Sequence, residues 1–475
     1  MRPDLRSMAL PGVLSVLAIA VVAGAVLLFG GARDPALVAA TAPDTGTAAE
    51  DPAPAGAAGD ADDPADDADD PAAGDPQSEP GAEDAEDPAS EDAEDAEDAD
   101  DAPDPQDASG TEPGPDGDEP PAEDTTTSPT PAPSAPALPP GPPTDERVLE
   151  VRTEIGGNIS PKSVVASPGG LFLAQNMMYR HTITVYDRTH ELVATIPDTV
   201  NPTEFGLDGP DAEVRGAPVE AAFTPDGRYA YVSNYAMYGA GYDREGTDTC
   251  SPADGYDDST VYRLDLETLA IDQVIPVGSV PKYVAVTPDG SRVLVTNWCS
   301  YDLSIIDVAT GTEVDRVELG RYPRGIAVTS DSSTAYIALM GTYDILVLDL
   351  DDGSSDLLAG IGRGPRHLVL SPDDRTLYAT INSDGVVAKI DLATQEVVTT
   401  ATGQAPRSMD IAADGRSLYV VNYLGDTVSK VRTSDMSVLQ TLDVADKPIG
   451  ITYDRGTGQV WVASYSGVIT VMDDR

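Results

Sequence analysis

Five cationic residues occupy the same position of a repeated pattern, each directly after a proline. The repeat prolines are spaced by 57, 63, 42, 42, 41 and 42 residues. The residues that follow them are Lys162, Val219, Lys282, Arg324, Arg366, Arg407 and Ile449. If the repeats surround one axis, these cations converge and would attract an anion, because arginine offers bidentate hydrogen bonds to carboxylate or phosphate. The alternative is that they pair with acidic residues of neighbouring repeats or are simply solvated.

Polar and aromatic residues recur near the same point of the repeat. Asparagine ends several of the second apolar segments, and a tryptophan follows one of them: Asn176, Asn234, Asn297, Asn422 and Trp298. We expect these side chains at the same mouth, where the asparagines either bind a ligand or tie loops to the backbone. His367 follows Arg366 and is the best candidate for acid–base catalysis. The alternative for His367 is a histidine packed between repeats.

The elements that would position these residues are short strands. Each repeat opens with the proline and an apolar strand, continues through a polar turn such as Thr224–Gly227, and enters a second strand. The third strand usually ends in aspartate, which can bond the backbone of the next turn. Four short strands in about 42 residues are typical of a β-propeller. The sequence therefore predicts an all-β, seven-bladed propeller over residues 148–475.

The last repeat runs out at its third strand, Ile469–Met472. The segment Arg147–Ile155 resembles the fourth strands of other repeats and directly precedes the first repeat. We predict that this N-terminal strand completes the seventh blade, because closing the ring removes exposed strand edges.

The chain has two cysteines and three histidines. Cys250 and Cys299 fall in equivalent loops of adjacent blades, so we predict a disulfide in an oxidising compartment. Two cysteines exclude a four-cysteine zinc site or cysteine-ligated iron–sulfur cluster, and no C-x-x-C-H motif is present for a c-type haem. The acidic stretches 257–258 and 349–352 lack the spaced oxygen pattern of a calcium site. We expect no metal and no cofactor.

The N-terminal segment 1–31 has the features of a membrane signal. The run Leu10–Phe29 is 20 apolar or weakly polar residues long, enough to span a bilayer as a helix. Arg2 and Arg6 precede it, so the short N-terminus should stay cytoplasmic. We favour an uncleaved anchor with the propeller on the extracytoplasmic side. A cleaved signal peptide, which would give a secreted protein, is the alternative.

Residues 32–147 form a linker rich in alanine, aspartate, glutamate and proline. Residues 43–147 carry 34 acidic residues and one basic residue. Such a segment cannot bury enough apolar surface to offset its conformational entropy, so we predict disorder. It would act as a solvated tether, a weak cation sponge or a cell-wall spacer. The propeller is acidic too, with 46 acidic and 24 basic residues after Arg147, which argues against a nucleic-acid partner.

The second strands carry a family resemblance. They read Tyr231-Val-Ser-Asn234, Leu294-Val-Thr-Asn297 and Tyr419-Val-Val-Asn422, beside Thr-Pro-Asp-Gly turns. Residues 148–475 thus resemble the YVTN-repeat β-propeller family, although Leu339, Ile381 and Ser464 replace the repeat asparagine. The resemblance implies a secreted or surface propeller. More distantly, these residues are similar to bacterial lactonases and to the haem d1 domain. The fold alone does not choose among the functions of these proteins.

These patterns predict a membrane-anchored, extracytoplasmic and monomeric propeller that binds an anionic small molecule or a cell-envelope component at its channel mouth. A lactonase-like hydrolase using the same mouth is one alternative, and a structural envelope protein is another. An enzyme should place a histidine or a pair of carboxylates against the cationic ring, whereas a binding protein needs only the ring and its rim.

Overall fold

The computed structural model describes residues 141–236, 238–242 and 249–475. The predicted membrane segment 1–31 and residues 32–140 of the predicted linker lie outside these ranges. Within them, no helix is both long enough and apolar enough to cross a membrane.

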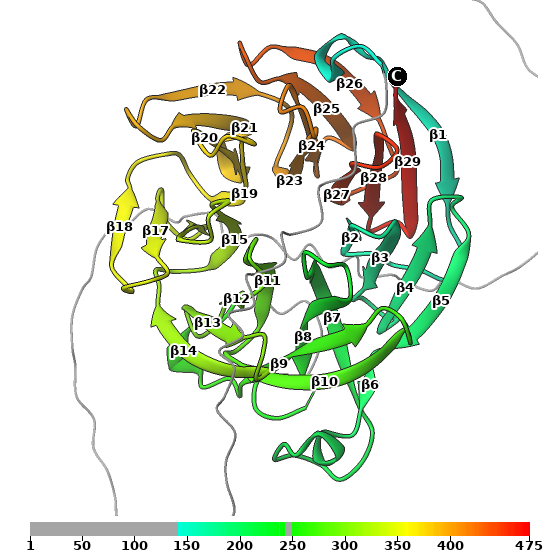
Figure 1. Cartoon of the computed structure of the whole chain (residues 1–475), viewed down its shortest axis with the longest axis vertical. Coiled ribbons are helices and arrows are strands. Elements are labelled where there is room, and N and C mark those ends of the chain that lie inside the picture. Colours follow the sequence, from blue (N-terminus) through cyan, green and yellow to red (C-terminus); the bar gives the residue numbers. More distant parts are fainter. Residues whose placement is uncertain (1–140, 237, 243–248) are drawn as a thin grey trace, which may run out of the picture. The chain divides into compact units, whose positions relative to one another are not determined.

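The strands of the described residues form seven antiparallel sheets arranged in a ring, as Figure 1 shows. Blade one consists of β2 (Ser163–Ala166), β3 (Leu171–Asn176), β4 (Thr182–Asp187) and β5 (Leu192–Pro197). Blade two consists of β7 (Val214–Phe223), β8 (Tyr229–Ala236), β9 (Ser259–Asp265) and β10 (Ala270–Val277), with β6 (Thr199–Val200) added beside β7. Blade three consists of β11 (Pro281–Val286), β12 (Arg292–Asn297), β13 (Asp302–Asp307) and β14 (Thr312–Glu318).

The remaining blades repeat this order. Blade four consists of β15 (Pro323–Val328), β16 (Thr334–Leu339), β17 (Ile345–Asp349) and β18 (Ser355–Leu358). Blade five consists of β19 (Pro365–Leu370), β20 (Thr376–Ile381), β21 (Val386–Asp391) and β22 (Val397–Ala401). Blade six consists of β23 (Pro406–Ile411), β24 (Ser417–Asn422), β25 (Thr427–Arg432) and β26 (Val438–Asp443). Blade seven consists of β27 (Pro448–Asp454), β28 (Gln459–Ser464), β29 (Val468–Asp474) and β1 (Leu149–Ile155).

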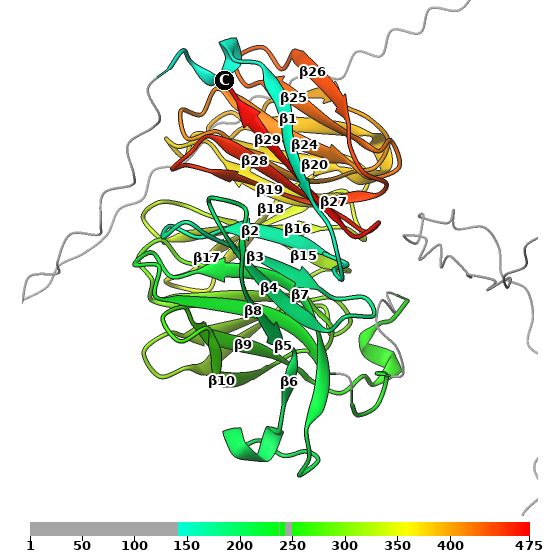
Figure 2. The same ribbon diagram turned by 90° about the vertical axis from the view of Figure 1, so that its right-hand side faces the viewer.

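Short 3₁₀ helices occur in the connections. They are η1 (Thr144–Glu146), η2 (Pro202–Phe205), η3 (Pro252–Asp254) and η4 (Asn382–Asp384). Helix η1 lies at the C-terminal end of the predicted linker, residues 32–147. Helix η2 and strand β6 belong to the long connection between blades one and two. This connection projects outward from the ring in Figures 1 and 2.

The ring closes as predicted. Strand β1 pairs antiparallel with β29, with Leu149 opposite Asp474 and Ile155 opposite Ile469. The closing strand begins at Leu149, two residues later than expected, and the C-terminus lies beside it (Figure 1). The first strand of each blade contacts the first strands of both neighbours, from β2 through β27 and back to β2. These inner strands surround the central channel.

A buried ion pair fixes the closing segment to blade six. The Lys430 ammonium and the Asp474 carboxylate lie 2.5 Å apart, and both side chains are fully buried. Lys430 Nζ also donates to the carbonyl oxygen of Arg147 at 2.9 Å. The Tyr419 hydroxyl donates to the second oxygen of Asp474 at 2.6 Å. The charges are therefore paired and hydrogen-bonded, as burial requires, and they tie the chain on both sides of the ring closure.

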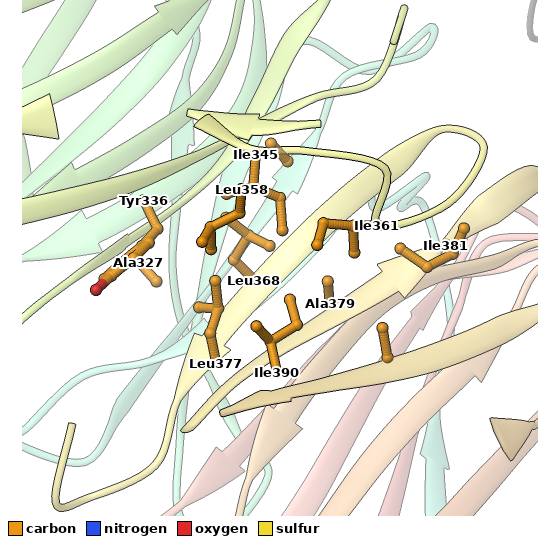
Figure 3. Packing of buried hydrophobic residues seen from close by; sticks show 12 residues of the cluster. Ala327, Tyr336, Ile345, Leu358, Ile361, Leu368, Leu377, Ala379, Ile381 and Ile390 are labelled. Atoms are coloured by element: carbon orange, nitrogen blue, oxygen red, sulfur yellow. The ribbon is translucent and has the colours of Figure 1, made fainter. Parts of the chain in front are cut away.

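The space between blades is filled by apolar side chains from facing sheets. Figure 3 shows this between blades four and five, where Ile345 and Leu358 of one blade face Leu368, Leu377 and Ile390 of the next. All five are buried. Both faces of the second and third strands are covered in this way, as in β12 and β13, whereas outer strands such as β14 and β22 are largely exposed.

The aspartates that end the third strands have the structural role expected of them. Asp307 accepts a hydrogen bond from the backbone N–H of Thr310 at 2.7 Å, and Asp187 accepts one from Thr189 at 2.8 Å. Asp391 does the same with Thr394 at 2.8 Å. These bonds start the turn into the outer strand.

Candidate functional site

The backbone has an unusual conformation directly before most of the repeat prolines, where the inner strands begin. The residue before the proline has a left-handed φ in five blades: Val280 at 57°, Tyr322 at 55°, Gly364 at 69°, Ala405 at 51° and Lys447 at 56°. The carbonyl oxygen of Val280 accepts a hydrogen bond from the N–H of Trp298 at 2.9 Å, and the other four make the equivalent bond. Positive φ is costly for residues with a Cβ. The cost is met by the surrounding hydrogen bonds, which fix where each inner strand begins.

A β-bulge follows the proline in six blades. The pairing register shifts, for example, between Pro281 and Tyr283 and between Pro406 and Ser408. A bulge places an extra residue on one strand, so consecutive side chains can share a face of the sheet. Lys282 and Tyr283 accordingly line the same cavity. The bulges therefore give the channel a second layer of side chains below the cations.

The predicted cations meet at one point. A cavity of about 20 Å³ in the channel is lined by the residue after every repeat proline, which is room for about one water molecule. We call this cavity the cation ring. It contains all five predicted cations together with two apolar residues: Lys162, Lys282, Arg324, Arg366, Arg407, Val219 and Ile449.

The charges of the ring repel one another. The side chains of Lys162, Arg324 and Arg407 make no ion pair with any residue in the described ranges. Burial, and then the four other cations of the ring, hold the pKa of Lys162 well below its usual range. Arg366 donates from Nη1 to the carbonyl oxygen of Arg407 at 3.0 Å. The ring is thus a concentrated positive site within an acidic protein.

Aromatic rings support the cations from the side. Arg407 lies 3.5 Å from the ring centre of Tyr423, and Lys162 lies 5.3 Å from that of Tyr465. Trp298 is buried, and its ring centre is 5.3 Å from Lys282 Nζ and 5.5 Å from the Arg324 guanidinium. Cation–π contacts stabilise a buried cation without cancelling its charge. The positive potential in the channel is therefore preserved.

A larger cavity adjoins the ring. It measures about 130 Å³ and is lined by the second layer of the inner strands and by residues further along them. Four residues line both spaces, so the two cavities meet: Glu220, Tyr283, His367 and Ser408. We call the larger space the chamber.

Two carboxyl groups line the chamber. Burial raises the pKa of Glu220 to about 7, although Lys162 and Arg324 act in the opposite direction. Burial also raises the pKa of Asp410, whose carboxyl accepts hydrogen bonds from the N–H groups of Ile411 and Tyr453, both at 2.7 Å. Asp410 is therefore committed to the junction of blades six and seven, whereas Glu220 faces the ring and can change charge near neutral pH.

His367 and Tyr283 form a hydrogen-bonded pair in the chamber wall. Burial, together with Arg366 and Arg324, lowers the pKa of His367 to about 3, so the imidazole is neutral. The Met409 N–H donates to Nδ1 at 3.2 Å, which leaves the ring proton on Nε2. Nε2 lies 2.9 Å from the Tyr283 hydroxyl oxygen and therefore donates to it. The Tyr283 O–H is consequently left to donate to another acceptor.

The four predicted asparagines lie inside the blades. All are fully buried. Asn234 accepts from the Ala217 N–H at 2.8 Å and donates to Asp198 at 2.6 Å. Asn297 donates to Asp302 and Ser304, and Asn176 and Asn422 bond hydroxyls of the neighbouring strand in the same way. None lines the ring or the chamber, so we leave them out of the proposed site.

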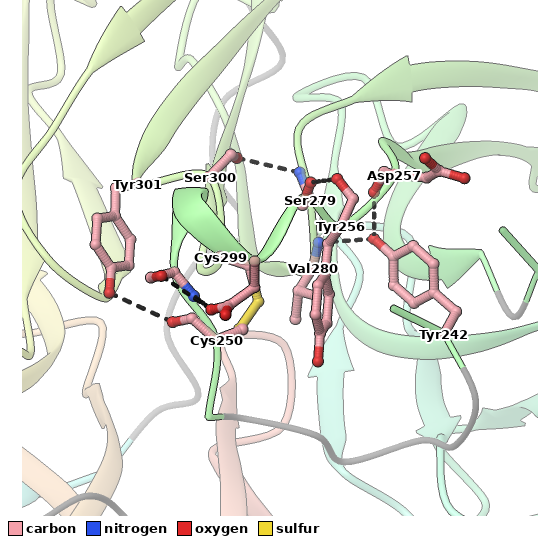
Figure 4. The surroundings of a disulfide bond; sticks show 11 residues. Tyr242, Cys250, Tyr256, Asp257, Ser279, Val280, Cys299, Ser300 and Tyr301 are labelled. Carbon is pink, nitrogen blue, oxygen red and sulfur yellow. Dashed lines mark hydrogen bonds between the residues drawn. A yellow bond between two sulfur atoms is a disulfide. The ribbon is translucent and has the colours of Figure 1, made fainter. Parts of the chain in front are cut away.

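The predicted disulfide forms between Cys250 and Cys299, whose Cα atoms are 5.2 Å apart. Figure 4 shows its surroundings: the Tyr301 hydroxyl donates to the Cys250 carbonyl, and the Cys299 N–H donates to the carbonyl of Ser279. The disulfide belongs to a buried cluster that includes Trp298 and Val219, and Val219 also lines the cation ring. The cross-linked loops therefore lie next to the ring.

The ring is predictable from the sequence, but most of the chamber is not. Simple strand alternation turns the residue after each ring position away from the channel, which hides Glu220, Tyr283 and Ser408. The bulges that turn them inward have no clear sequence signal. His367, the predicted candidate for acid–base catalysis, lines the chamber. In the part of the chain that the structure describes, no three metal-binding side chains gather into a metal site.

Comparisons with known proteins show the fold alone. No protein-family model matches the chain, and no curated protein matches it. Among solved structures, a chain of hydrazine synthase from Kuenenia stuttgartiensis is similar, with a TM-score of 0.53 and 17% sequence identity. The match covers 67% of this chain and 97% of that chain. It supports the propeller architecture, and the YVTN-type resemblance stays a prediction.

Proposed function

We propose that this protein is an extracytoplasmic, membrane-anchored propeller that binds a small anion in the cation ring. The observation that carries the proposal is the convergence of five cations on one cavity of about 20 Å³. Natural proteins retain such repulsive clusters at functional sites, where the strain is relieved by a ligand. A buried anion would pair with several cations at once and form charge-assisted hydrogen bonds.

Isothermal titration calorimetry tests the proposal: the full chain is titrated with bromide, phosphate and small carboxylates at low ionic strength, and the heat of binding is measured. We expect at least one of these anions to bind at millimolar concentration or below, and added inert salt to weaken the binding. If none of them binds at millimolar concentration, the ring has a structural role and the envelope-protein alternative leads.

Anion affinity should fall as the pH rises through about 7. Below this pH Glu220 is protonated and neutral, because its pKa is raised to about 7. Above it, the new carboxylate beside Lys162 and Arg324 opposes a second anion, and Lys162, whose pKa is lowered, loses charge in the same direction. We expect an affinity loss of about tenfold or more between pH 6 and pH 8. Glu220→Gln should remove most of this dependence, and an unchanged profile in that variant would contradict the assignment.

The membrane part of the proposal rests on the apolar run Leu10–Phe29 and the basic residues before it. The full chain should fractionate with membranes, and protease added from outside should release the propeller by cutting the linker. Recovery of a soluble mature chain that begins after the apolar run would instead support the secreted form.

A lactonase-like hydrolase is the second candidate. The chamber places Glu220 and His367 next to the ring, which is the arrangement expected of an enzyme. Glu220, with a pKa of about 7, is suited to general-base catalysis near neutral pH. Hydrolysis of small lactones by the wild type, lost in Glu220→Gln, would favour the enzyme over the binding protein.

A further inference from the structure

We propose that the ligand is a small monocarboxylate that carries hydroxyl groups, with its carboxylate in the cation ring and its hydroxyls in the chamber. This inference rests on the proposed function and extends it from a charge to a chemical class. It follows from three features of the channel: the shared wall of the two cavities, the polar groups of the chamber and the chamber's size.

The ring and the chamber adjoin each other. Glu220, Tyr283, His367 and Ser408 line both. The ring itself, with room for about one water molecule, holds only a charged head group. Whatever is attached to that head group must therefore extend into the chamber.

The chamber offers hydrogen bonds that a hydroxyl group can use. The Tyr283 O–H is left to donate, because its oxygen already accepts from His367 Nε2. The Ser408 hydroxyl lines the cavity, and no bond from it to another described residue is seen. Glu220 is bonded on one oxygen by the Ala221 N–H at 3.3 Å. A hydroxyl both donates and accepts hydrogen bonds, so it can pair with these donors and acceptors. An alkyl group would leave them unpaired.

The size of the chamber limits the tail. The chamber measures about 130 Å³ against about 20 Å³ for the ring, which on the same scale is room for about six water molecules, or a tail of a few non-hydrogen atoms. The carboxyls of Glu220 and Asp410 also face this space. Among the described residues, no lysine or arginine lines the chamber, so a second carboxylate on the ligand would lie there without a cation, and this disfavours dicarboxylates. The fit is therefore to a short, hydroxylated acid with one charge.

The test compares two acids of equal size in calorimetric titrations of the full chain at pH 6. Glycerate carries two hydroxyls, and 2-methylbutyrate replaces both by carbon. We expect glycerate to bind about tenfold more tightly, the scale of two net hydrogen bonds. Ser408→Ala and Tyr283→Phe should each lower glycerate affinity by about fivefold and leave 2-methylbutyrate affinity unchanged. Ser354→Ala, which alters an exposed serine of blade four, is the matched control and should change neither.

The outcomes separate the two proposals. Equal affinities, or tighter binding of 2-methylbutyrate, would overturn the hydroxy-acid assignment and leave the anion site in place. If inorganic phosphate binds and neither acid does, the hydroxy-acid assignment is likewise overturned and the anion site stays in place. If bromide, phosphate and both acids all fail to bind, the proposed function itself fails.

Discussion

Lys430→Met should lower the free energy of unfolding by about 3–5 kcal/mol, because it leaves the Asp474 carboxylate buried without its partner. The ammonium is fully buried, 2.5 Å from Asp474 Oδ1, and also bonds the carbonyl of Arg147. The variant therefore loses the ion pair and one anchor of the closing strand together. Denaturant unfolding measures the stability, and amide hydrogen exchange should show faster opening of β1 than of the inner strands.

The control for this prediction removes both charges. Lys430→Met combined with Asp474→Asn leaves no unpaired charge in the interior, so much of the lost stability should return. If Lys430→Met alone unfolds at the same denaturant midpoint as the wild type, the ion pair does not hold the ring closed.

Arg407→Ala should weaken anion binding by about 10- to 150-fold, which corresponds to about 1.5–3 kcal/mol for a charge-assisted hydrogen bond. Its Nε is buried and makes no hydrogen bond to a residue within the described ranges, so this donor is available to a ligand. Arg366→Ala should act in the same way, since both side chains line the ring. Calorimetric titration with the tightest anion of the panel measures the loss.

Stability distinguishes a binding role of the ring from a structural one. Removing one cation relieves repulsion among five, so Arg407→Ala should unfold within about 1 kcal/mol of the wild type, despite losing its contact with Tyr423. Arg375→Ala is the control, because Arg375 is an exposed cation outside the channel; it should change neither binding nor stability. A large loss of stability in Arg407→Ala with unchanged anion affinity would show that the ring serves the fold.

The sequence was sufficient to predict the propeller because its information is repeated. Seven repeat prolines, the last five at nearly constant spacing, and aspartates at the strand ends indicate the same blade many times. The unpaired third strand near Met472 identifies Arg147–Ile155 as its partner. The cation ring was predictable for the same reason: residues at one repeat position must converge on the axis of a closed ring.

The chamber was not predictable because it depends on local irregularity. The bulge that turns Tyr283 inward beside Lys282 breaks the two-residue period on which a strand prediction rests. The repeat asparagines show the opposite case. Their regular position suggested the mouth, but buried polar groups must find partners, and Asn297 finds them in Asp302 and Ser304 of its own blade.

The central claim is that an anion occupies the cation ring, and anomalous scattering from crystals of the full chain grown with bromide tests it most directly. We expect a bromide peak inside the channel, within contact distance of Lys162, Arg324 and Arg407. The peak should vanish in Arg407→Ala and persist in Arg375→Ala. Bromide peaks at surface arginines with none in the channel would contradict the account.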